Sequence, residues 1–445
     1  MPTKSGHRDV GQPSAWVVAS IVAGFAAGST VSDQVLHHTT EDGRLWDSIE
    51  LPEQAQLLLP AATVVLPSVP PPEMANASTI FVPPGSSLQN LLGKPFHVFH
   101  EDFLSIIGQD PTLSLIADSG TDPRFHEAVV WYPPTDEVFF AQNAGAKAAG
   151  TGLNKSSVIQ KISLPEAMAV SHLRSAVGQV QVTVVDFDPP VINPNGGTNY
   201  KGNMIFDGEG MGSDVPPALY LANPNPPYNT TRKEDILPSI FTANFHNAVN
   251  SANGHIYFTD VTYGYLQDFR PEPVLPNQVY KLDSVTKAVT AVADELINCN
   301  GEQIAAGTNR GNNLEWIGLT FSPDGKYAYV TDTGAAMAFY GYNQAKPSGI
   351  YRYTVAEDGT FEYKKLFAYS TSGIPDGVHC DSKGNVYAGC GDGVHVWNPS
   401  GVFLGKIFTG ETAANFQIAG KGRVVICGET HLYYAQIAAE AAPIT

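Results

Sequence analysis

Short apolar runs separated by turn residues recur through most of the chain. Each pair has a first strand, a turn rich in Gly, Asp or Asn, and a second strand rich in Tyr, Phe and Val, which is the pattern of a β-hairpin. Five such pairs are VVWYPPTDEVFFAQN, VNSANGHIYFTD, LTFSPDGKYAYVTD, VHCDSKGNVYAG and IAGKGRVVICGE. The wider gap between the first two pairs contains MIFDGEG and ALYLANP, which predict a sixth unit.

Units of roughly 40 to 70 residues, with further strands between the hairpins, are typical of a β-propeller with four-stranded blades. We therefore predict an all-β, six-bladed propeller over residues 96–445, with a pair of β-sandwiches as the alternative. The composition of 42 Gly, 33 Pro and only 15% charged residues agrees, because it suits short strands and tight turns.

The first 95 residues follow a different pattern. The apolar run AWVVASIVAGFAAG after a weakly basic opening predicts a signal peptide over residues 1–29, with a disordered arm or an uncleaved anchor as alternatives. Prolines in AATVVLPSVPPPEM and FVPPGSS predict an extended arm over residues 30–95, laid over the main body. Three glycosylation sequons, at Asn76, Asn154 and Asn229, agree with a secretory or secreted protein.

The charge balance narrows the class of partner. There are 43 acidic and 25 basic residues, a net charge of −18, and no basic run that could follow a phosphate backbone. These features argue against nucleic acid and anionic membranes and favour a small-molecule ligand. The four cysteines, which form no CxxC pair, are predicted to be buried thiols, with one or two disulfides as the alternative: Cys299, Cys380, Cys390 and Cys427. The oligomeric state stays open.

The innermost strand of each propeller blade starts beside the central axis, so residues just before those strands converge on one pocket. Four segments with candidate chemistry lie there: FHEAVV with Glu127, NFHNAV with Phe245 and His246, EWIGLTF with Ile317, and IPDGVHCD with Asp376 and His379. Carboxyl groups desolvated in such a pocket have raised pKa values and serve as general acids or bases. The two histidines are candidate proton donors or acceptors near neutral pH.

Each of these candidates has a structural alternative. Glu127 and Asp376 could cap strand-end amides, and His246 and His379 could be structural histidines. We expect His126, next to Glu127 on a strand, to point to the opposite face. The chain has no GxSxG nucleophile motif, and FDGEGMG lacks the spacing of a nucleotide-binding loop.

Several long sequence motifs occur in the same order as in a known protein family. These are NGGTNYKGNMIF, FTDVTYGYLQDFRPEPVLPNQVYKLD, FSPDGKYAYVTDTG and IPDGVHCDSKGNVYAGCGDGVHVWNPSG. Over about residues 96–435 the chain resembles the fungal lactonohydrolases of the gluconolactonase and senescence-marker-protein family. The resemblance implies a propeller with a divalent cation, usually calcium, on its axis. The metal polarises a lactone carbonyl in that family, and water opens the ring.

The family's metal ligands are a Glu before the first inner strand, an Asn before a middle one, and the Asp of a PDG motif. Glu127 and Asp376 match the first and last ligands, but Ile317 falls where the ligand Asn should be. A further substrate-binding Asn, in an Asn-Asp-Val motif, falls on Phe245, although a slip of two residues would bring Asn247 there. Because hydrocarbon side chains cannot replace oxygen ligands, we expect no metal or other cofactor. Calcium held by Glu127, Asn247 and Asp376 is the alternative.

The expected function follows from this pattern. We assign catalysis to Glu127, Asp376, His246 and His379, and substrate binding to Phe245, Asn247, Trp316 and Ile317. Phe245, Trp316 and Ile317 suit an apolar substrate, with core packing as the alternative. Relatives in this fungal group act in secondary metabolism, which implies a metal-independent cyclase of the hetero-Diels–Alder type. One alternative is a calcium-dependent lactonohydrolase opening a sugar or pantoyl-type lactone, with ligands from Asn247, Glu315 or main-chain oxygens. Another is a noncatalytic binding propeller.

Overall fold

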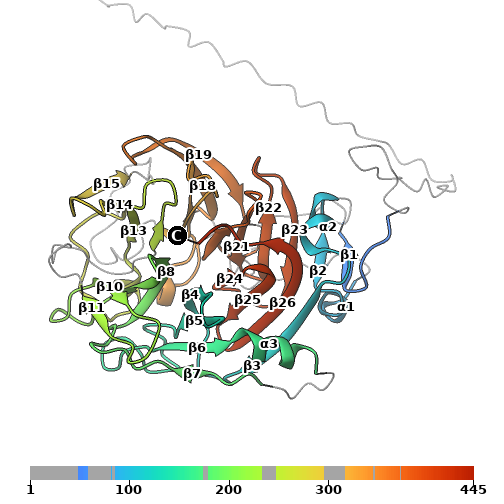
Figure 1. Ribbon diagram of the computed structural model, residues 1–445, viewed down its shortest axis with the longest axis horizontal. Coiled ribbons are helices and arrows are strands. Elements are labelled where there is room, and N and C mark those ends of the chain that lie inside the picture. Colours follow the sequence, from blue (N-terminus) through green and yellow to red (C-terminus); the bar gives the residue numbers. More distant parts are fainter. Residues whose placement is uncertain are drawn as a thin grey trace, which may run out of the picture. The chain divides into compact units, whose positions relative to one another are not determined.

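The chain forms six antiparallel, four-stranded blades around a common axis (Figure 1), so the predicted all-β, six-bladed propeller is confirmed. The structure is a computed structural model that describes residues 49–58, 82, 86–173, 179–232, 247–294, 316–343, 346–370 and 372–444, without the side chains of residues 316 and 317. The predicted signal peptide therefore lies outside the described residues.

Each blade is numbered from its innermost strand outwards. The first three blades are β4 (Glu127–Tyr132), β5 (Glu137–Ala141), β6 (Ile159–Ser163) and β7 (Thr183–Val184); β8 (Pro194–Tyr200), β9 (Asn203–Gly208), β10 (Ala218–Ala222) and β11 (Thr230–Arg232); and β12 (Asn247–Val249), β13 (Ile256–Asp260), β14 (Gln278–Leu282) and β15 (Val289–Ala293). The second blade differs from the expected hairpin unit, because MIFDGEG and ALYLANP form its second and third strands.

The other three blades complete the ring. They are β16 (Trp316–Phe321), β17 (Tyr327–Asp332), β18 (Gly349–Val355) and β19 (Phe361–Tyr369); β20 (Val378–Cys380), β21 (Val386–Cys390), β22 (Gly393–Trp397) and β23 (Phe403–Phe408); and β24 (Asn415–Ile418), β25 (Lys421–Gly428), β26 (His431–Glu440) and β3 (Thr112–Asp118). Successive inner strands contact one another, and β24 contacts β4.

The last blade joins distant parts of the sequence. Its outermost strand, β3, precedes the first blade and pairs antiparallel with β26, with Ala117 opposite Leu432. This pairing closes the ring. A hydrophobic cluster under the closure includes Ile116, Val138 and Leu432, which come from the last and first blades. Similar clusters fill the next four blade interfaces in ring order.

The described part of the predicted N-terminal arm contributes to the fifth blade. Strand β1 (Ala55–Leu57) pairs in parallel with β2 (Phe96–Val98), and β2 pairs antiparallel with β23. The short helix α1 (Leu88–Gly93) lies between them in sequence and starts at Ser87, whose side chain accepts a hydrogen bond from the Asn90 amide. The blade thereby becomes a six-stranded sheet.

The other helices are short connections. They are α2 (Asp102–Ile107), α3 (Leu164–Ser171), α4 (Tyr263–Leu266) and the 3-10 turn η5 (Ala338–Tyr340). Among the described residues, no helix has the length and apolar character needed to cross a membrane. Cys380, Cys390 and Cys427 are free buried thiols, as predicted, while Cys299 lies outside the described residues.

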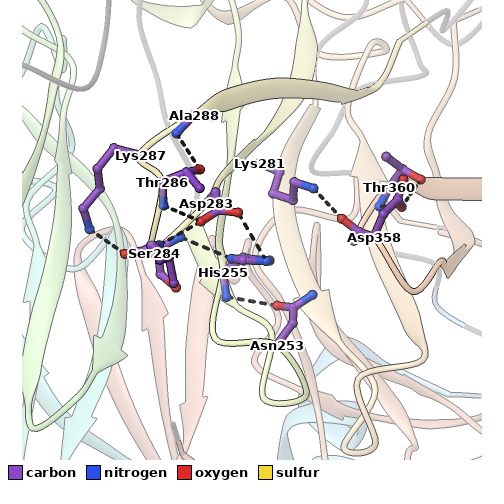
Figure 2. A network of polar contacts seen from close by, with 12 residues as sticks. Asn253, His255, Lys281, Asp283, Ser284, Thr286, Lys287, Ala288, Asp358 and Thr360 are labelled. Atoms are coloured by element: carbon purple, nitrogen blue, oxygen red, sulfur yellow. Dashed lines mark hydrogen bonds and ion pairs between the residues drawn. The ribbon is translucent and has the colours of Figure 1, made fainter.

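Polar side chains shape a turn of the third blade and connect this blade to the fourth (Figure 2). The Asp283 carboxylate accepts hydrogen bonds from the amides of Val285 and Thr286, each over 2.8 Å, and so shapes the turn between β14 and β15. Lys281 on β14 donates to the carbonyl oxygen of Asp358 in the fourth blade. Such bonds fix register within one blade and its position against the next.

The ring closure predicts that two leucines on paired strands contribute very differently to the free energy of unfolding. Leu432 is fully buried, whereas Leu115 on β3 is 48% exposed. Leu432→Ala should lower the free energy of unfolding by about 2–5 kcal/mol, because it leaves a cavity beneath the closing pair. Leu115→Ala, the control, should change it by about 0.5 kcal/mol or less. Chemical denaturation measures both, and equal effects would contradict the importance of this interface.

Candidate functional site

Two carboxyl groups meet on the axis where the inner strands begin. Glu127 is the first residue of β4, and Asp376 lies just before β20. The side chains of Asp376 and Glu127 lie close enough for a hydrogen bond between them when one carboxyl group is protonated. Asn415, the first residue of β24, donates from Nδ2 to Oε2 of Glu127 over 2.7 Å. A hydrogen bond between two carboxyl groups requires a proton on one of them, because carboxylates only accept.

Glycines at two positions let these groups approach so closely. A Cβ atom on Gly377 would lie 2.4 to 2.8 Å from the atoms of the Asn415 side-chain amide. A Cβ atom on Gly318 would lie 2.4 Å from the carbonyl oxygen of Asp376. That oxygen accepts a hydrogen bond from Oγ1 of Thr331 over 3.1 Å, which fixes the backbone of Asp376. Close packing against Asn415 therefore explains why position 377, in the PDG motif, is a glycine.

Burial raises the pKa of both carboxyl groups. The side chain of Glu127 is buried, and burial followed by the charge of Asp376 raises its pKa well above the ordinary value, against the opposing effects of His126 and Asn415. Burial raises the pKa of Asp376 to about 7, although the charge of His126 lowers it. Oδ1 of Asp376 is shielded from solvent and has no hydrogen-bond partner. The pair therefore retains a proton near neutral pH and titrates as a unit.

A histidine–glutamate pair stands beside the two carboxyl groups. Nδ1 of His126 lies 2.8 Å from Oε1 of Glu429, and Asn143 donates to Oε2 of Glu429 over 3.2 Å. Burial alone would lower the pKa of His126, but Glu429, Glu127 and Asp376 together raise it to about 10. Burial alone would raise the pKa of Glu429, yet its interactions with His126 and Asn143 hold it below the ordinary value. The site thus has its own imidazolium.

Glu209, in the loop FDGEGMG after β9, also interacts with this imidazolium. It is buried, and burial raises its pKa well above the ordinary value, while His126 and Arg270 oppose that shift. Arg270 donates from Nη1 to the carbonyl oxygens of Gly212 and Val215, and so holds the loop. We call the following set the axial acid cluster: Glu127, Glu209, Asp376, Glu429 and His126.

Asn247 and His379 line a cavity that adjoins the carboxyl pair. Nδ2 of Asn247 donates to Oδ1 of Asp207 over 2.6 Å, and its buried Oδ1 has no hydrogen-bond partner. Burial lowers the pKa of His379 to about 4, against a hydrogen bond with Asn415, so this imidazole is neutral. Both residues border a cavity of about 130 Å³, the axial cleft, whose other walls are inner-strand residues of all six blades, the turn residues Ser251, Ser322 and Pro323, and residues 441–444.

The remaining predicted site residues are not placed by the structure. Phe245 and His246 lie outside the described residues, just before Asn247 begins β12. Trp316 and Ile317 begin β16, but their side chains are not described. The apolar wall that these residues predict stays a prediction. The described residues bring together Glu127 and Asp376, and separately Asn247 and His379.

The prediction that His126 faces away from the site is wrong. Its ring pairs with Glu429 and interacts with Glu127. The simple alternation of side chains fails because His126 precedes the strand, next to the bridge between Phe125 and Glu429. Ala128 has a φ of 51°, and the register of β4 against β5 shifts after Glu127.

Sequence reasoning also missed three members of the site. Asn415 was detectable, because it opens the sixth inner strand as Glu127 opens the first. Glu209 and Glu429 follow the second strands of their blades, at the end of the quoted runs MIFDGEG and IAGKGRVVICGE. No short motif marks them, since they reach the axis only through the loops of the closed ring.

The described residues do not by themselves make up a calcium site. Calcium takes six to eight oxygen ligands, but no group of three or more His, Cys, Asp or Glu side chains in the described part of the chain could hold a metal ion. Oε2 of Glu127 accepts from Asn415 and Nδ2 of Asn247 donates to Asp207, whereas the buried Oδ1 atoms of Asn247 and Asp376 have no hydrogen-bond partner and are the oxygens that a cation would use. His126, whose pKa is raised, adds a positive charge that would repel a cation.

The fold and the axial acid cluster define a propeller with an acid–base site. Residues 316–436 match the family described as SMP-30/Gluconolactonase/LRE-like region. Lactonohydrolase oryL of Aspergillus oryzae is 27% identical over 345 residues, covering 72% of this chain and 68% of the relative. Lactonohydrolase oryH of the same species is 24% identical, covering 71% and 74%. A gluconolactonase structure from Xanthomonas campestris has a TM-score of 0.54 at 19% identity, covering 77% and 95%. The chain is thus a six-bladed propeller that is similar to lactonohydrolases and gluconolactonases, and residues 316–436 match their family.

The raised pKa of Asp376 predicts a pH-dependent gain in stability when the carboxyl group is removed. The folded state holds a proton that the unfolded state releases, so stability falls as pH rises from the ordinary pKa towards about 7. The melting temperature of Asp376→Asn minus that of wild type should therefore be several degrees larger at about pH 8 than at about pH 4.

Asp136 provides a control of opposite sign. Although burial raises its pKa, Arg423 and Trp131 together lower it below the ordinary value. Asp136→Asn should lose stability relative to wild type above that pKa and show little change below it. Thermal denaturation at the two pH values measures both variants. Matching pH trends in the two would contradict the raised pKa of Asp376.

Proposed function

We propose that the chain is a metal-independent enzyme in which the axial acid cluster donates a proton or a hydrogen bond to an oxygen of an apolar secondary metabolite, leading to a cyclisation of the hetero-Diels–Alder type. The observation that carries this proposal is the pair formed by the buried Glu127 and the half-buried Asp376 beside the His126–Glu429 ion pair. A site with a proton-bearing carboxyl group and an imidazolium donates protons or hydrogen bonds without needing a Lewis acid.

The chemistry assigns a role to each group. The substrate would be a phenol with a hydroxyl-bearing carbon attached at the ortho position of the ring, and this hydroxyl group is lost as water. The acid supplies the proton to the leaving oxygen, and the phenol proton passes to the conjugate base. The resulting heterodiene adds to an alkene, forming one C–C and one C–O bond without further proton transfer. A hydrogen bond from Asp376 or Glu127 to the diene oxygen stabilises the charge that develops there.

Orientation of the two reacting parts supplies the remaining acceleration. Well-oriented intramolecular reactions gain up to about 7–11 kcal/mol of the barrier. In this proposal Phe245, Trp316 and Ile317 provide an apolar wall that holds diene and alkene together, and His246 is a proton donor or acceptor. His379, a neutral imidazole bonded to Asn415, acts by positioning the amide that donates to Glu127.

A metal-independent lactone hydrolysis is the second candidate, because the two Aspergillus relatives are named lactonohydrolases. The carboxylate of the pair would take a proton from water as the water oxygen attacks the lactone carbonyl carbon. Its protonated partner would return a proton to the ring oxygen as the ring C–O bond breaks, leaving a hydroxy acid. The same residues therefore serve either reaction.

Entry into the secretory pathway is a further part of the proposal. Asn154 and Asn229, in two of the predicted sequons, are exposed on the described surface. Asn76 lies outside the described residues. Exposure is what an attached glycan requires, and it supports the route that the N-terminal sequence predicts.

Product analysis with and without a chelator tests the proposal. The purified chain would be incubated with an ortho-hydroxybenzyl alcohol plus an electron-rich alkene, and separately with glucono-δ-lactone and pantolactone. We expect enantiomerically enriched cyclic ether, at a rate unaffected by EDTA or added calcium. Asp376→Asn should slow this reaction by about 100-fold or more, as loss of a general acid does. The control Asp324→Asn, in an exposed turn, should behave as wild type.

Other outcomes separate the alternatives. Ring opening of a lactone, insensitive to EDTA but lost in Asp376→Asn, would favour hydrolysis by the same cluster. Activity abolished by EDTA and restored by calcium would contradict metal independence. Binding of these compounds without turnover would support a noncatalytic propeller.

A further inference from the structure

The axial cleft is bordered by a segment that follows the last strand of the ring. Residues 441–444 continue from β26 and form part of the cleft wall, together with Cys380 and Gln417 from inner strands. Figure 1 marks this end of the chain in the middle of the ring. The segment therefore crosses from an outer strand of its blade to the axis.

The segment is anchored at its start and weakly held beyond it. The amide of Ser382 donates to the carbonyl oxygen of Glu440, and the amide of Ala441 donates to that of Gly420, each over 2.8 Å. Within the described part of the chain, Ala442, Pro443 and Ile444 have no hydrogen bonds. Ile444 is 39% exposed. A segment with few buried contacts and no hydrogen bonds opens at low free-energy cost.

The cleft beneath it is polar but carries no permanent charge. Its described lining contains hydroxyl and amide side chains and no Asp, Glu, Lys or Arg. The unpartnered Oδ1 of Asn247 and the neutral ring of His379 border this space. His379 contacts Asn415, which in turn donates to Glu127, so the cleft adjoins the axial acid cluster.

We propose that residues 442–444 act as a strap that limits solvent access to the axial cleft from the end of the ring opposite Glu127. With the strap closed, bulk water reaches the axis chiefly from the face where the inner strands begin. Release of the strap opens a second route, towards His379 and Cys380. This inference concerns access alone and does not depend on the proposed reaction.

Cys380 is a built-in reporter of that access. It borders the cleft and is only 4% exposed, and burial raises the pKa of its thiol. Cys390 and Cys427 are fully buried and do not border the cleft, so they serve as internal controls. Cys299 would be replaced by Ser in every variant to remove its signal.

Deletion of residues 442–445 tests the strap while keeping the hydrogen bonds of Glu440 and Ala441. Alkylation by iodoacetamide, followed by peptide mass spectrometry, would measure each thiol separately. We expect Cys380 to react about tenfold faster in the deletion variant, with Cys390 and Cys427 unchanged. Unchanged reactivity of Cys380 in a folded deletion variant would overturn the proposal, as would equal acceleration of all three thiols.

A point variant keeps the test decisive if the deletion does not fold. Ile444→Asp retains the backbone and places a charge against an uncharged lining, so it should release the strap and accelerate alkylation of Cys380. The exposed-surface control Val402→Asp should not. Slow alkylation of Cys380 in folded Ile444→Asp would reject the strap. Because the readout is thiol reactivity, its failure says nothing against the proposed function.

Discussion

Closure of the ring by the pairing of β3 with β26 is the constraint on which the rest of the structure depends. This pairing joins a strand that precedes the first blade to the last blade, and it places β24 against β4. Only in the closed ring do Glu127, Asp376 and Asn415, from three different blades, meet at one point. The buried cluster beneath the closure stabilises this arrangement, so apolar packing at the rim maintains polar chemistry at the axis.

The axial cluster is electrostatically costly, and its layout limits that cost. The carboxyl groups of Glu127 and Asp376 would repel if both were ionised, so desolvation favours keeping a proton on the pair. His126 and Glu429 provide opposite charges in hydrogen-bonding contact. Gly377 and Gly318 allow the approach that makes the pair possible. Residues that destabilise the folded state at neutral pH are those with the chemistry of a functional site.

The sequence predicted the fold well because its hairpins repeat: alternating strands and Gly-containing turns indicate each blade locally. Glu127 and Asp376 were found because each lies at an inner-strand start. His126, Glu209 and Glu429 could not be found in this way, since their positions depend on which loops meet across the ring. Within the expected pocket, Asn247 donates to Asp207, and His379 borders the axial cleft and connects through Asn415 to Glu127. Side-chain direction at bulged strand starts does not follow from simple alternation.

The central claim is that the pair of Glu127 and Asp376 holds a proton, and not a metal ion, near neutral pH. Carbon-13 NMR of the side-chain carboxyl carbons, assigned with Glu127→Gln and Asp376→Asn, tests it most directly. The account predicts one protonated carboxyl group in the pair near neutral pH, with resonances unmoved by calcium or EDTA. Two fully ionised carboxylates whose resonances shift together on addition of stoichiometric calcium would contradict it.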